Sequence, residues 1–148
     1  MARRVFLIPA VLAILGSGCE RPAPSPEDVT TFATASGCEP QQGCAVRGES
    51  VSMQLRFLAP PHALKPFPVQ LLVTTDQQVE SVVIAFSMAG MDMGLNRYRM
   101  VRDPQTGNWG ADVTLPMCVS GRSDWIAGVD LVIAGRDYRW TVPFVVQR

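Results

Sequence analysis

Three of the seven methionines lie in one short stretch, Phe86–Gly94, and these are the residues whose type and spacing best suit chemistry. Met91 and Met93 stand two positions apart, so their thioethers point to the same side of an extended segment. Thioether sulfur is a soft ligand that suits Cu(I) rather than magnesium or calcium. Gly90 and Gly94 flank the pair and permit a tight turn. This spacing predicts a Cu(I) site built on Met91 and Met93.

The remaining ligands of such a site are less defined. His62, the one histidine of the chain, lies in a proline-rich loop that could reach the same end of the domain and is the candidate third ligand. Met117 or Cys118 could contribute if their loop lies at that end, but the favoured interpretation is that Cys118 is half of a disulfide and Met117 a core residue. The alternative is that Met91 and Met93 cover the end of the domain as apolar residues, because methionine fills irregular gaps. A lone histidine is, in the same way, often simply solvated.

The inventory of reactive residues speaks against an enzyme. The chain has one histidine, no nucleophile-elbow sequence, no glycine-rich phosphate loop and no paired metal-ligand histidines. Asp92, between two methionines, forms no acid–base pair. Thirteen basic and thirteen acidic residues leave no net charge, so no basic face for nucleic acid is expected. The sequence predicts a binding protein.

The first eighteen residues have the layout of a secretory signal peptide. Arg3 and Arg4 precede the apolar run Val5–Leu15, and small residues follow directly before Cys19. The apolar run is too short for a membrane-spanning helix, which needs about 20 residues. We therefore expect an exported protein.

Cys19 directly after small residues resembles the lipobox of bacterial lipoproteins, whose cysteine takes a diacylglycerol and whose new amine is acylated. Gly16 departs from that pattern, which usually has leucine at this position. An ordinary signal peptide that leaves Cys19 as a thiol is the alternative. Several acyl chains would anchor the protein, since each buried methylene contributes about 0.8 kcal/mol. We expect a lipid anchor in the bacterial envelope facing the periplasm, and Glu20 in place of aspartate favours the outer membrane.

Residues 19–37 are rich in Pro, Ser, Thr and Ala and are predicted to be a flexible tether. They cannot bury enough apolar surface to offset the entropy of ordering. Residues 38–148 then form one domain, which is an ordinary size for a single core.

The domain sequence predicts short strands separated by turns. In the first run Val51, Met53, Leu55 and Phe57 share one face, which is typical of a half-buried strand. The seven expected strands are 51–58, 67–75, 79–88, 95–102, 109–115, 125–134 and 138–146. No stretch beyond the signal keeps an apolar period of 3.6. The pattern predicts an all-β domain, an immunoglobulin-like antiparallel β-sandwich of about seven strands.

Strand parity assigns two further sets of side chains. Met88 shares the parity of Ile84 and Phe86, so it is predicted to pack inward rather than to bind metal. A second set is predicted to be a solvated surface, with a patch for an acidic partner as the alternative. It comprises Arg97, Arg99, Arg102 and Arg122.

Three cysteines follow Cys19, and an exported domain lies where disulfides persist. Cys38, Cys44 and Cys118 allow one bridge and leave one thiol. A Cys38–Cys44 bridge would close a short loop, whereas a Cys44–Cys118 bridge would constrain the unfolded chain more. The sequence leaves the pairing open, with a slight preference for a bridge that uses Cys118. No CxxC spacing is present to indicate a redox role.

Several segments resemble the FixH-like and YtkA-like domain family, small exported or membrane-anchored β-sandwich domains of bacteria. The matching segments are Met88–Gly94, Gly107–Met117 and Trp125–Val132. Lipoproteins of this group carry MDMGxNR, here Met91–Arg97, and LPxC…W, here Leu115–Trp125. The resemblance covers most of residues 44–146.

This resemblance implies a non-enzymatic role. FixH-like proteins are associated with the assembly of copper-containing respiratory oxidases or with cation transport. The implied function is Cu(I) binding or delivery, with an oxidase subunit as partner. FixH proteins carry a transmembrane helix where this chain would carry a lipid. The alternative is a structural or assembly lipoprotein that contacts an envelope protein without metal.

Overall fold

The computed structural model describes residues 25, 28–34, 37–91, 94 and 96–146. Cys19, Asp92 and Met93 lie outside the described residues. Within the described ranges the chain is almost entirely β-strand and loop. None of their residues belong to a helix long and apolar enough to span a bilayer.

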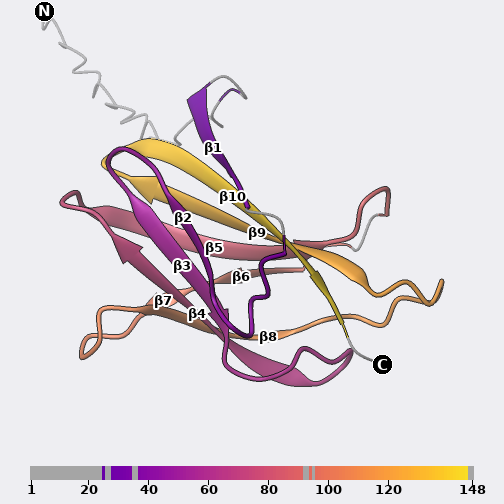
Figure 1. Cartoon of the computed structure of the whole chain (residues 1–148). Helices are drawn as coiled ribbons and strands as arrows, with labels where there is room; N and C mark the ends of the chain where they lie inside the picture. Colours follow the sequence, from indigo (N-terminus) through magenta and orange to yellow (C-terminus); the bar gives the residue numbers. More distant parts are fainter. Residues whose placement is uncertain (1–24, 26–27, 35–36, 92–93, 95, 147–148) are drawn as a thin grey trace, which may run out of the picture.

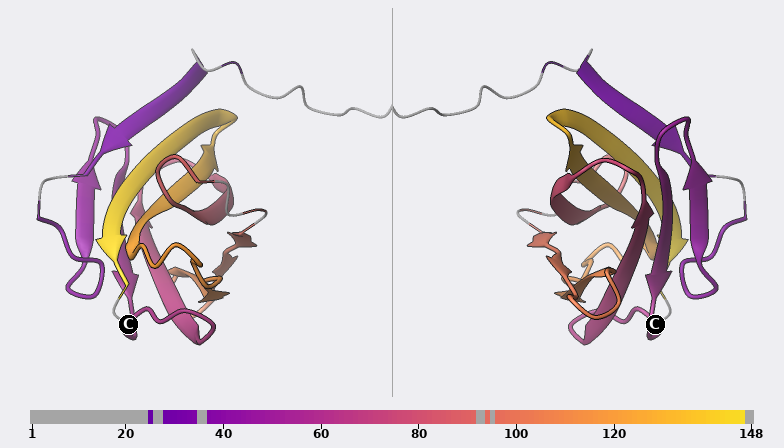
Figure 2. Two further views of the ribbon diagram at one scale, coloured as in Figure 1. Left: turned by 90° about the vertical axis from the view of Figure 1, so that its right-hand side faces the viewer. Right: turned by 90° about the vertical axis from the view of Figure 1, so that its left-hand side faces the viewer.

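Ten strands in the described residues form two five-stranded sheets that pack face to face (Figures 1 and 2). Sheet A has the order β1 (Val29–Ala33), β10 (Arg136–Val145), β9 (Asp124–Ile133), β5 (Val79–Ser87) and β6 (Arg97–Arg99). Sheet B has the order β2 (Cys44–Arg47), β3 (Ser52–Phe57), β4 (Pro66–Thr74), β8 (Trp109–Thr114) and β7 (Val101–Arg102). The predicted immunoglobulin-like β-sandwich is confirmed, with ten strands rather than about seven.

Each predicted run overlaps an observed strand, and the run 95–102 contains two. β6 pairs with β5 in sheet A, whereas β7 pairs with β8 in sheet B. Between them Met100 is buried, and its N–H donates a hydrogen bond to the carbonyl of Val82 at 2.9 Å. The inward turn at Met100 moves the chain from one sheet to the other, which alternation along the run does not reveal.

The predicted tether is wrong for Val29–Ala33, which form a strand parallel to β10. The ring of Phe32 stacks on Tyr138 with centroids 6.2 Å apart. The indole N–H of Trp140 donates to the hydroxyl of Thr34 at 2.8 Å. Pairing with β10 offsets the ordering entropy that the local composition cannot. Composition misses this strand because its partner lies more than a hundred residues away in sequence.

The core lies between the two sheets and follows the predicted parity. Phe57, Phe86 and Phe144 meet there, with the rings of Phe57 and Phe144 centred 5.0 Å apart. Met88 is buried, as predicted. At the β6–β8 edge the hydroxyl of Tyr98 donates to the carbonyl of Thr114 at 2.7 Å, which ties the two sheets together.

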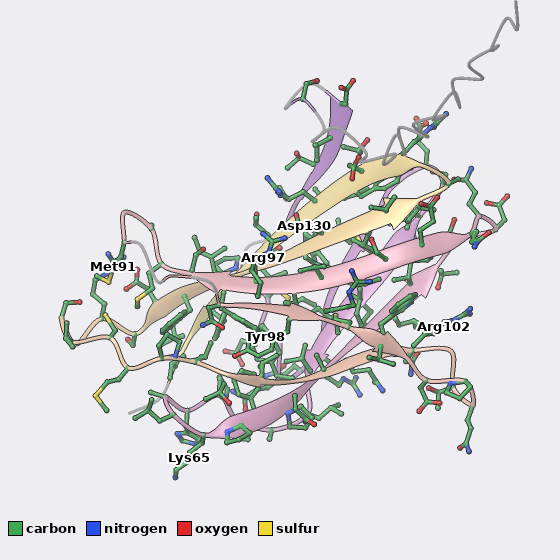
Figure 3. The ribbon with its side chains drawn as sticks, turned by 180° about the vertical axis from the view of Figure 1, so that it is seen from behind. Lys65, Met91, Arg97, Tyr98, Arg102 and Asp130 are labelled. Carbon is green, nitrogen blue, oxygen red and sulfur yellow. A yellow bond between two sulfur atoms is a disulfide. The ribbon has the colours of Figure 1, made fainter. Side chains whose placement is uncertain are left out.

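The two ends of the sandwich differ in content. One end, called the tip, gathers the β3–β4 loop 58–65, the described residues of the β5–β6 corner (88–91, 94 and 96), the β8–β9 loop 115–123 and the end of β10. The opposite end holds the short turns between β4 and β5 and between β9 and β10. Met91 and Lys65 lie at the tip in Figure 3, and Arg102 lies toward the other end. Because β1 runs parallel to β10, the chain enters sheet A at the end opposite the tip.

Cys38 and Cys44 form a disulfide, with Cα atoms 5.5 Å apart, and Cys118 is a free thiol. The preference for a bridge using Cys118 is therefore wrong. Cys44 lies in β2 beside the link that carries Cys38, whereas Cys118 lies in the β8–β9 loop. A Cys44–Cys118 bridge would have closed the longer loop and constrained the unfolded chain more. The pairing instead follows from which cysteine lies beside Cys44 in the folded sheet.

Loss of this disulfide is expected to lower the free energy of unfolding by about 2 kcal/mol, because the chain-entropy relation gives about this value for so short a loop. Cys38→Ala tests this by urea denaturation and leaves the buried sulfur of Cys44 in place. Cys118→Ala is the control that removes a thiol without breaking a bridge. A loss above about 4 kcal/mol would mean that the bridge also orders the native link to β1.

Candidate functional site

Met91 and Cys118 lie side by side at the tip, although 27 positions separate them in sequence. The sulfur of Cys118 is 3.6 Å from the sulfur of Met91, and the thiol donates a hydrogen bond to the thioether. Both side chains are half-buried against the core. Two soft sulfur atoms this close, reachable from solvent, form a ligand pair of the kind that Cu(I) prefers.

The β5–β6 corner positions Met91. Met88 is buried at its base, and its carbonyl accepts a hydrogen bond from the N–H of Met91 at 3.2 Å. Gly90 has a φ of 71° within this turn, a conformation that a side chain would disfavour. The inward Met88 thus anchors the turn, and the next methionine projects beside the β8–β9 loop.

A tight turn in the β8–β9 loop positions Cys118. Its carbonyl accepts a hydrogen bond from the N–H of Gly121 at 3.1 Å. Its sulfur lies 3.0 Å from the hydroxyl oxygen of Ser120. Just before this turn, the carbonyl of Leu115 accepts a hydrogen bond from Leu64, which joins the loop to the β3–β4 loop.

Arg122 connects the two loops that carry the sulfur atoms. Its Nη1 donates to the carbonyl of Ala89 at 2.9 Å, and its Nε donates to a carboxylate oxygen of Asp124 at 2.9 Å. A second contact joins the same guanidinium and carboxylate. Exposed ion pairs contribute little stability, so the value of this contact is geometric. Arg122 holds the β5–β6 corner against the loop of Cys118.

The surroundings of Cys118 favour its thiolate. The hydrogen bond with the Ser120 side chain lowers the pKa of the thiol. The backbone N–H groups of Ser120 and Arg122 and the charge of Arg122 act in the same direction, whereas desolvation opposes them. The thiolate is the form that binds metal and reacts, so Cys118 is prepared for either.

Alkylation of Cys118 by iodoacetamide is expected to reach half its maximal rate at a pH below that of an ordinary thiol. The lowered pKa leaves more thiolate at any given pH, and the rate follows the thiolate fraction. Ser120→Ala should move the midpoint to higher pH, since it removes the largest stabilising contact. Ser123→Ala is the control and should leave the profile in place. A Ser120→Ala profile that overlays the parent would contradict the assignment.

Of the other predicted ligands, the structure describes His62 and Met117. Met93 lies outside the described residues. His62 lies in the β3–β4 loop at the tip, but among the described residues its imidazole makes no hydrogen bond to either sulfur. Met117 is exposed beside Cys118, so the prediction that it is a core residue is wrong. The sequence made Cys118 a ligand only if its loop reached this end, and the fold places the loop there.

Within the described ranges no three His, Cys, Asp or Glu side chains gather in a metal-binding group. The sulfur pair is a different kind of site, because one of its ligands is a thioether.

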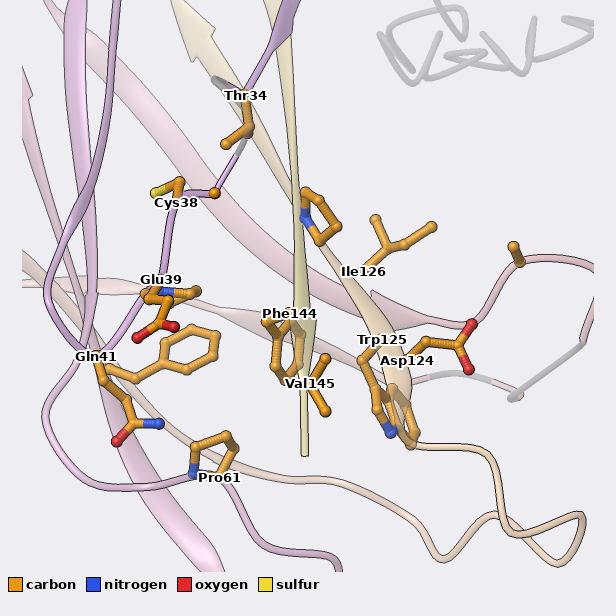
Figure 4. Close-up of a pocket in the computed structure, with 15 residues that line it drawn as sticks. Thr34, Cys38, Glu39, Gln41, Pro61, Asp124, Trp125, Ile126, Phe144 and Val145 are labelled. Atoms are coloured by element: carbon orange, nitrogen blue, oxygen red, sulfur yellow. The ribbon is translucent and has the colours of Figure 1, made fainter. Parts of the chain in front are cut away.

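A cavity of about 740 Å³ opens between the link 37–41 and the paired ends of β9 and β10 (Figure 4). Its apolar wall includes Phe144 and Pro61, and its acidic side chains are Glu39 and Asp124. Ala89 also lines it, so both groups that Arg122 binds form part of its wall. Neither Met91 nor Cys118 lines the cavity, so its connection to the loop of Cys118 runs through the contacts that Arg122 makes.

Asn96 is 7% exposed, and its side-chain oxygen and nitrogen have no hydrogen-bond partner in the described structure. Its carbonyl accepts from Phe86, which places it at the base of the corner. We expect Asn96→Leu to raise the free energy of unfolding by about 1–3 kcal/mol, because it removes an unsatisfied polar group at similar size. Thermal unfolding measures this. A destabilised variant would show that the amide has a partner, such as a buried water.

No family model matches this chain, and no curated protein matches it either. A solved structure that is similar in part is the 1.98 Å crystal structure of an engineered protein. The two share 14% sequence identity with a TM-score of 0.47, and the match covers 64% of this chain and 20% of the engineered one. The chain thus spans about a fifth of that protein's length, and the likeness says nothing about function.

Proposed function

We propose that this chain is a lipid-anchored periplasmic protein that binds Cu(I) at its tip and delivers it, without catalysing a reaction. The observation that carries the proposal is the 3.6 Å approach of the Met91 thioether to the Cys118 thiol. The pair includes Cys118, which the sequence offered only as a conditional ligand after Met93 and His62. Those two residues stay candidates for further ligands.

The chemistry of the pair favours Cu(I) over other ions. Zinc sites are built from thiolate, imidazole and carboxylate, usually four in number, and a thioether is not one of these. Magnesium and calcium take oxygen ligands. A thiolate and a thioether together match a soft monovalent ion. The lowered pKa of Cys118 supports the thiolate that such binding requires.

The envelope location rests on the N-terminal sequence and is supported by the Cys38–Cys44 disulfide, which persists in oxidising compartments. An anchor at Cys19 would precede β1, which enters sheet A at the end opposite the tip. The sulfur pair would then face away from the membrane, where an oxidase subunit or another envelope protein could reach it. Cys19→Ser should move the protein from the membrane fraction to the soluble fraction.

The second candidate function is a lipoprotein that contacts an envelope partner without metal. The exposed apolar residues at the tip favour it, since Met117 and Val119 are both turned to solvent. The same residues serve the first proposal, so the metal itself must be tested.

A Cu(I) competition titration on residues 20–148 separates the two functions. Ascorbate keeps copper as Cu(I) and leaves the Cys38–Cys44 disulfide intact, and a chromophoric chelator reports the competition. Tight binding at one ion per chain, lost in Met91→Ile and in the Met91→Ile, Met93→Ile double variant, supports delivery of Cu(I). Both variants keep side-chain volume, so folding should survive. Binding no tighter than in the double variant would reject the metal and favour the second function.

A further inference from the structure

Exposed apolar side chains are concentrated at the tip. Seven large hydrophobic side chains are exposed in the described residues, and five belong to the tip. They are Leu58, Leu64, Met117, Val119 and Val145. Met117 is 61% exposed and Val119 is 98% exposed, and they are the two neighbours of Cys118 in sequence. Exposed apolar residues that flank a ligand, as Met117 and Val119 flank Cys118, mark a contact surface.

The charges next to the sulfur pair largely cancel. Arg122 lies beside Cys118 and is paired with Asp124 through two contacts. A partner that covers Met117 and Val119 therefore meets an apolar surface beside a neutralised ion pair, and the exposed Lys65, next to Leu64, adds one positive charge at the tip. Such a surface selects an apolar, uncharged face rather than a strongly acidic or basic one.

A Cu(I) ion held by Met91 and Cys118 could also take further ligands. The described residues bring two sulfur atoms together, and Cu(I) accepts additional soft ligands. A second protein with its own thiolates can bind the ion before Met91 and Cys118 release it. The exposed flanks of Cys118 are where such a protein would have to sit.

The direction in which β1 enters the sandwich disfavours two possible partners for the apolar surface at the tip, the bilayer and a second anchored copy of this chain. Glu20–Asp28 can span at most about 32 Å, and β10 adds a sandwich length of about 33 Å between the entry of β1 and the tip. The membrane would therefore lie beyond the opposite end. Two copies on one membrane would both point their tips away from it, so tip-to-tip contact would require one to turn over.

We propose that the tip surface formed by Leu64, Met117 and Val119 is the docking surface for a small copper-carrying protein domain that presents a pair of cysteine thiols in an apolar face. This inference rests on the proposed function of the sulfur pair. Transfer is a ligand exchange in which copper stays Cu(I) throughout. When the ion leaves, the Cys118–copper bond breaks as a bond to a partner sulfur forms. The proton lost by that partner thiol returns to Cys118.

The test measures the rate of Cu(I) transfer between the copper-loaded chain, residues 20–148, and a soluble copper-carrier domain that has an exposed CxxC pair. Val119→Asp and Val119→Lys should each slow transfer by about tenfold or more, because either charge is desolvated at an apolar contact. Both should leave the Cu(I) affinity of the chain unchanged, since Val119 supplies no ligand. Transfer to glutathione, which needs no docking surface, should keep its rate.

Val101→Asp is the matched control, because Val101 is 70% exposed but lies on β7 outside the tip. Equal slowing by Val101→Asp, or no slowing by the Val119 variants, would overturn the docking surface while leaving the metal site in place. Slowing by one charge alone would mean that the partner is charged, against the proposal.

A copper-dependent dimer in sedimentation would make a second copy the occupant. Binding of the tip to lipid vesicles would assign the surface to the membrane.

Loss of all Cu(I) binding in the parent chain would instead reject the proposed function itself. The affinity measurement thus distinguishes failure of the metal site from failure of the docking surface.

Discussion

Replacing Cys118 with serine is expected to weaken Cu(I) binding by more than about 100-fold. Loss of a residue that merely supports a metal ligand costs about 10–100-fold in affinity, so loss of the stronger ligand should cost more. Serine keeps the size of the side chain but offers a hard oxygen in place of a soft sulfur. Fold stability should change little, because Cys118 is half-buried in a loop. The measurement is the ascorbate-buffered competition titration with residues 20–148.

Met117→Ile is the matched control for this experiment. It removes an exposed thioether next to Cys118, so it tests whether any sulfur atom near the tip contributes to Cu(I) affinity. The affinity of this variant should stay within about threefold of the parent, in contrast to the loss of a ligand. If Cys118→Ser binds Cu(I) as tightly as the parent, the sulfur pair is not the site, and the proposal fails with it.

Replacing Trp140 with alanine is expected to lower the free energy of unfolding by about 3–5 kcal/mol, the usual cost of removing a fully buried tryptophan side chain. Trp140 is among the largest side chains with no exposed surface, and it lies in β10 between β1 and β9. Domains of this size have a total stability of about 5–15 kcal/mol, so the variant should be close to unfolding at physiological temperature. Urea denaturation followed by circular dichroism measures the change.

Two milder variants, Trp140→Phe and Thr34→Val, separate the loss of unfolding free energy into a hydrogen-bond part and a packing part. Thr34→Val removes the acceptor of the 2.8 Å hydrogen bond from the indole, and Trp140→Phe removes the donor and part of the volume. Each should cost less than Trp140→Ala, and Thr34→Val should cost about 1–3 kcal/mol, as for an unsatisfied buried donor. A Trp140→Ala variant that loses under 1 kcal/mol would mean that the sheets repack around the cavity.

The two large effects should be independent, because the sulfur pair lies in loops at the tip while Trp140 lies within a strand of the core. Arg122 should affect Cu(I) binding indirectly, because it sets the distance between the loop of Cys118 and the corner that carries Met91. It ties the loop of Cys118 to the carbonyl of Ala89, two positions before Met91. The stable sandwich thus carries a site whose shape depends on one exposed guanidinium.

Much of the fold followed from local patterns. Alternation in the run that begins at Val51 and the parity of Ile84 and Phe86 predicted strands and their buried faces correctly, since side chains on a strand alternate between two faces. The same parity predicted that Met88 packs inward. The switch at Met100 and the strand β1 could not be predicted this way. Their stability comes from partners distant in sequence, Val82 and β10.

For the candidate site, the sequence by itself determined the candidate ligand atoms, which are the thioethers of the β5–β6 corner and the sulfur atoms of the three cysteines after Cys19. Only the tertiary structure decided which of them meet. It paired Cys38 with Cys44 because β2 lies beside the link that carries Cys38. It left Cys118 3.6 Å from Met91 because the loops after β5 and β8 end at the same tip. Ligand type is a property of a residue, whereas ligand geometry is a property of how two sheets pack.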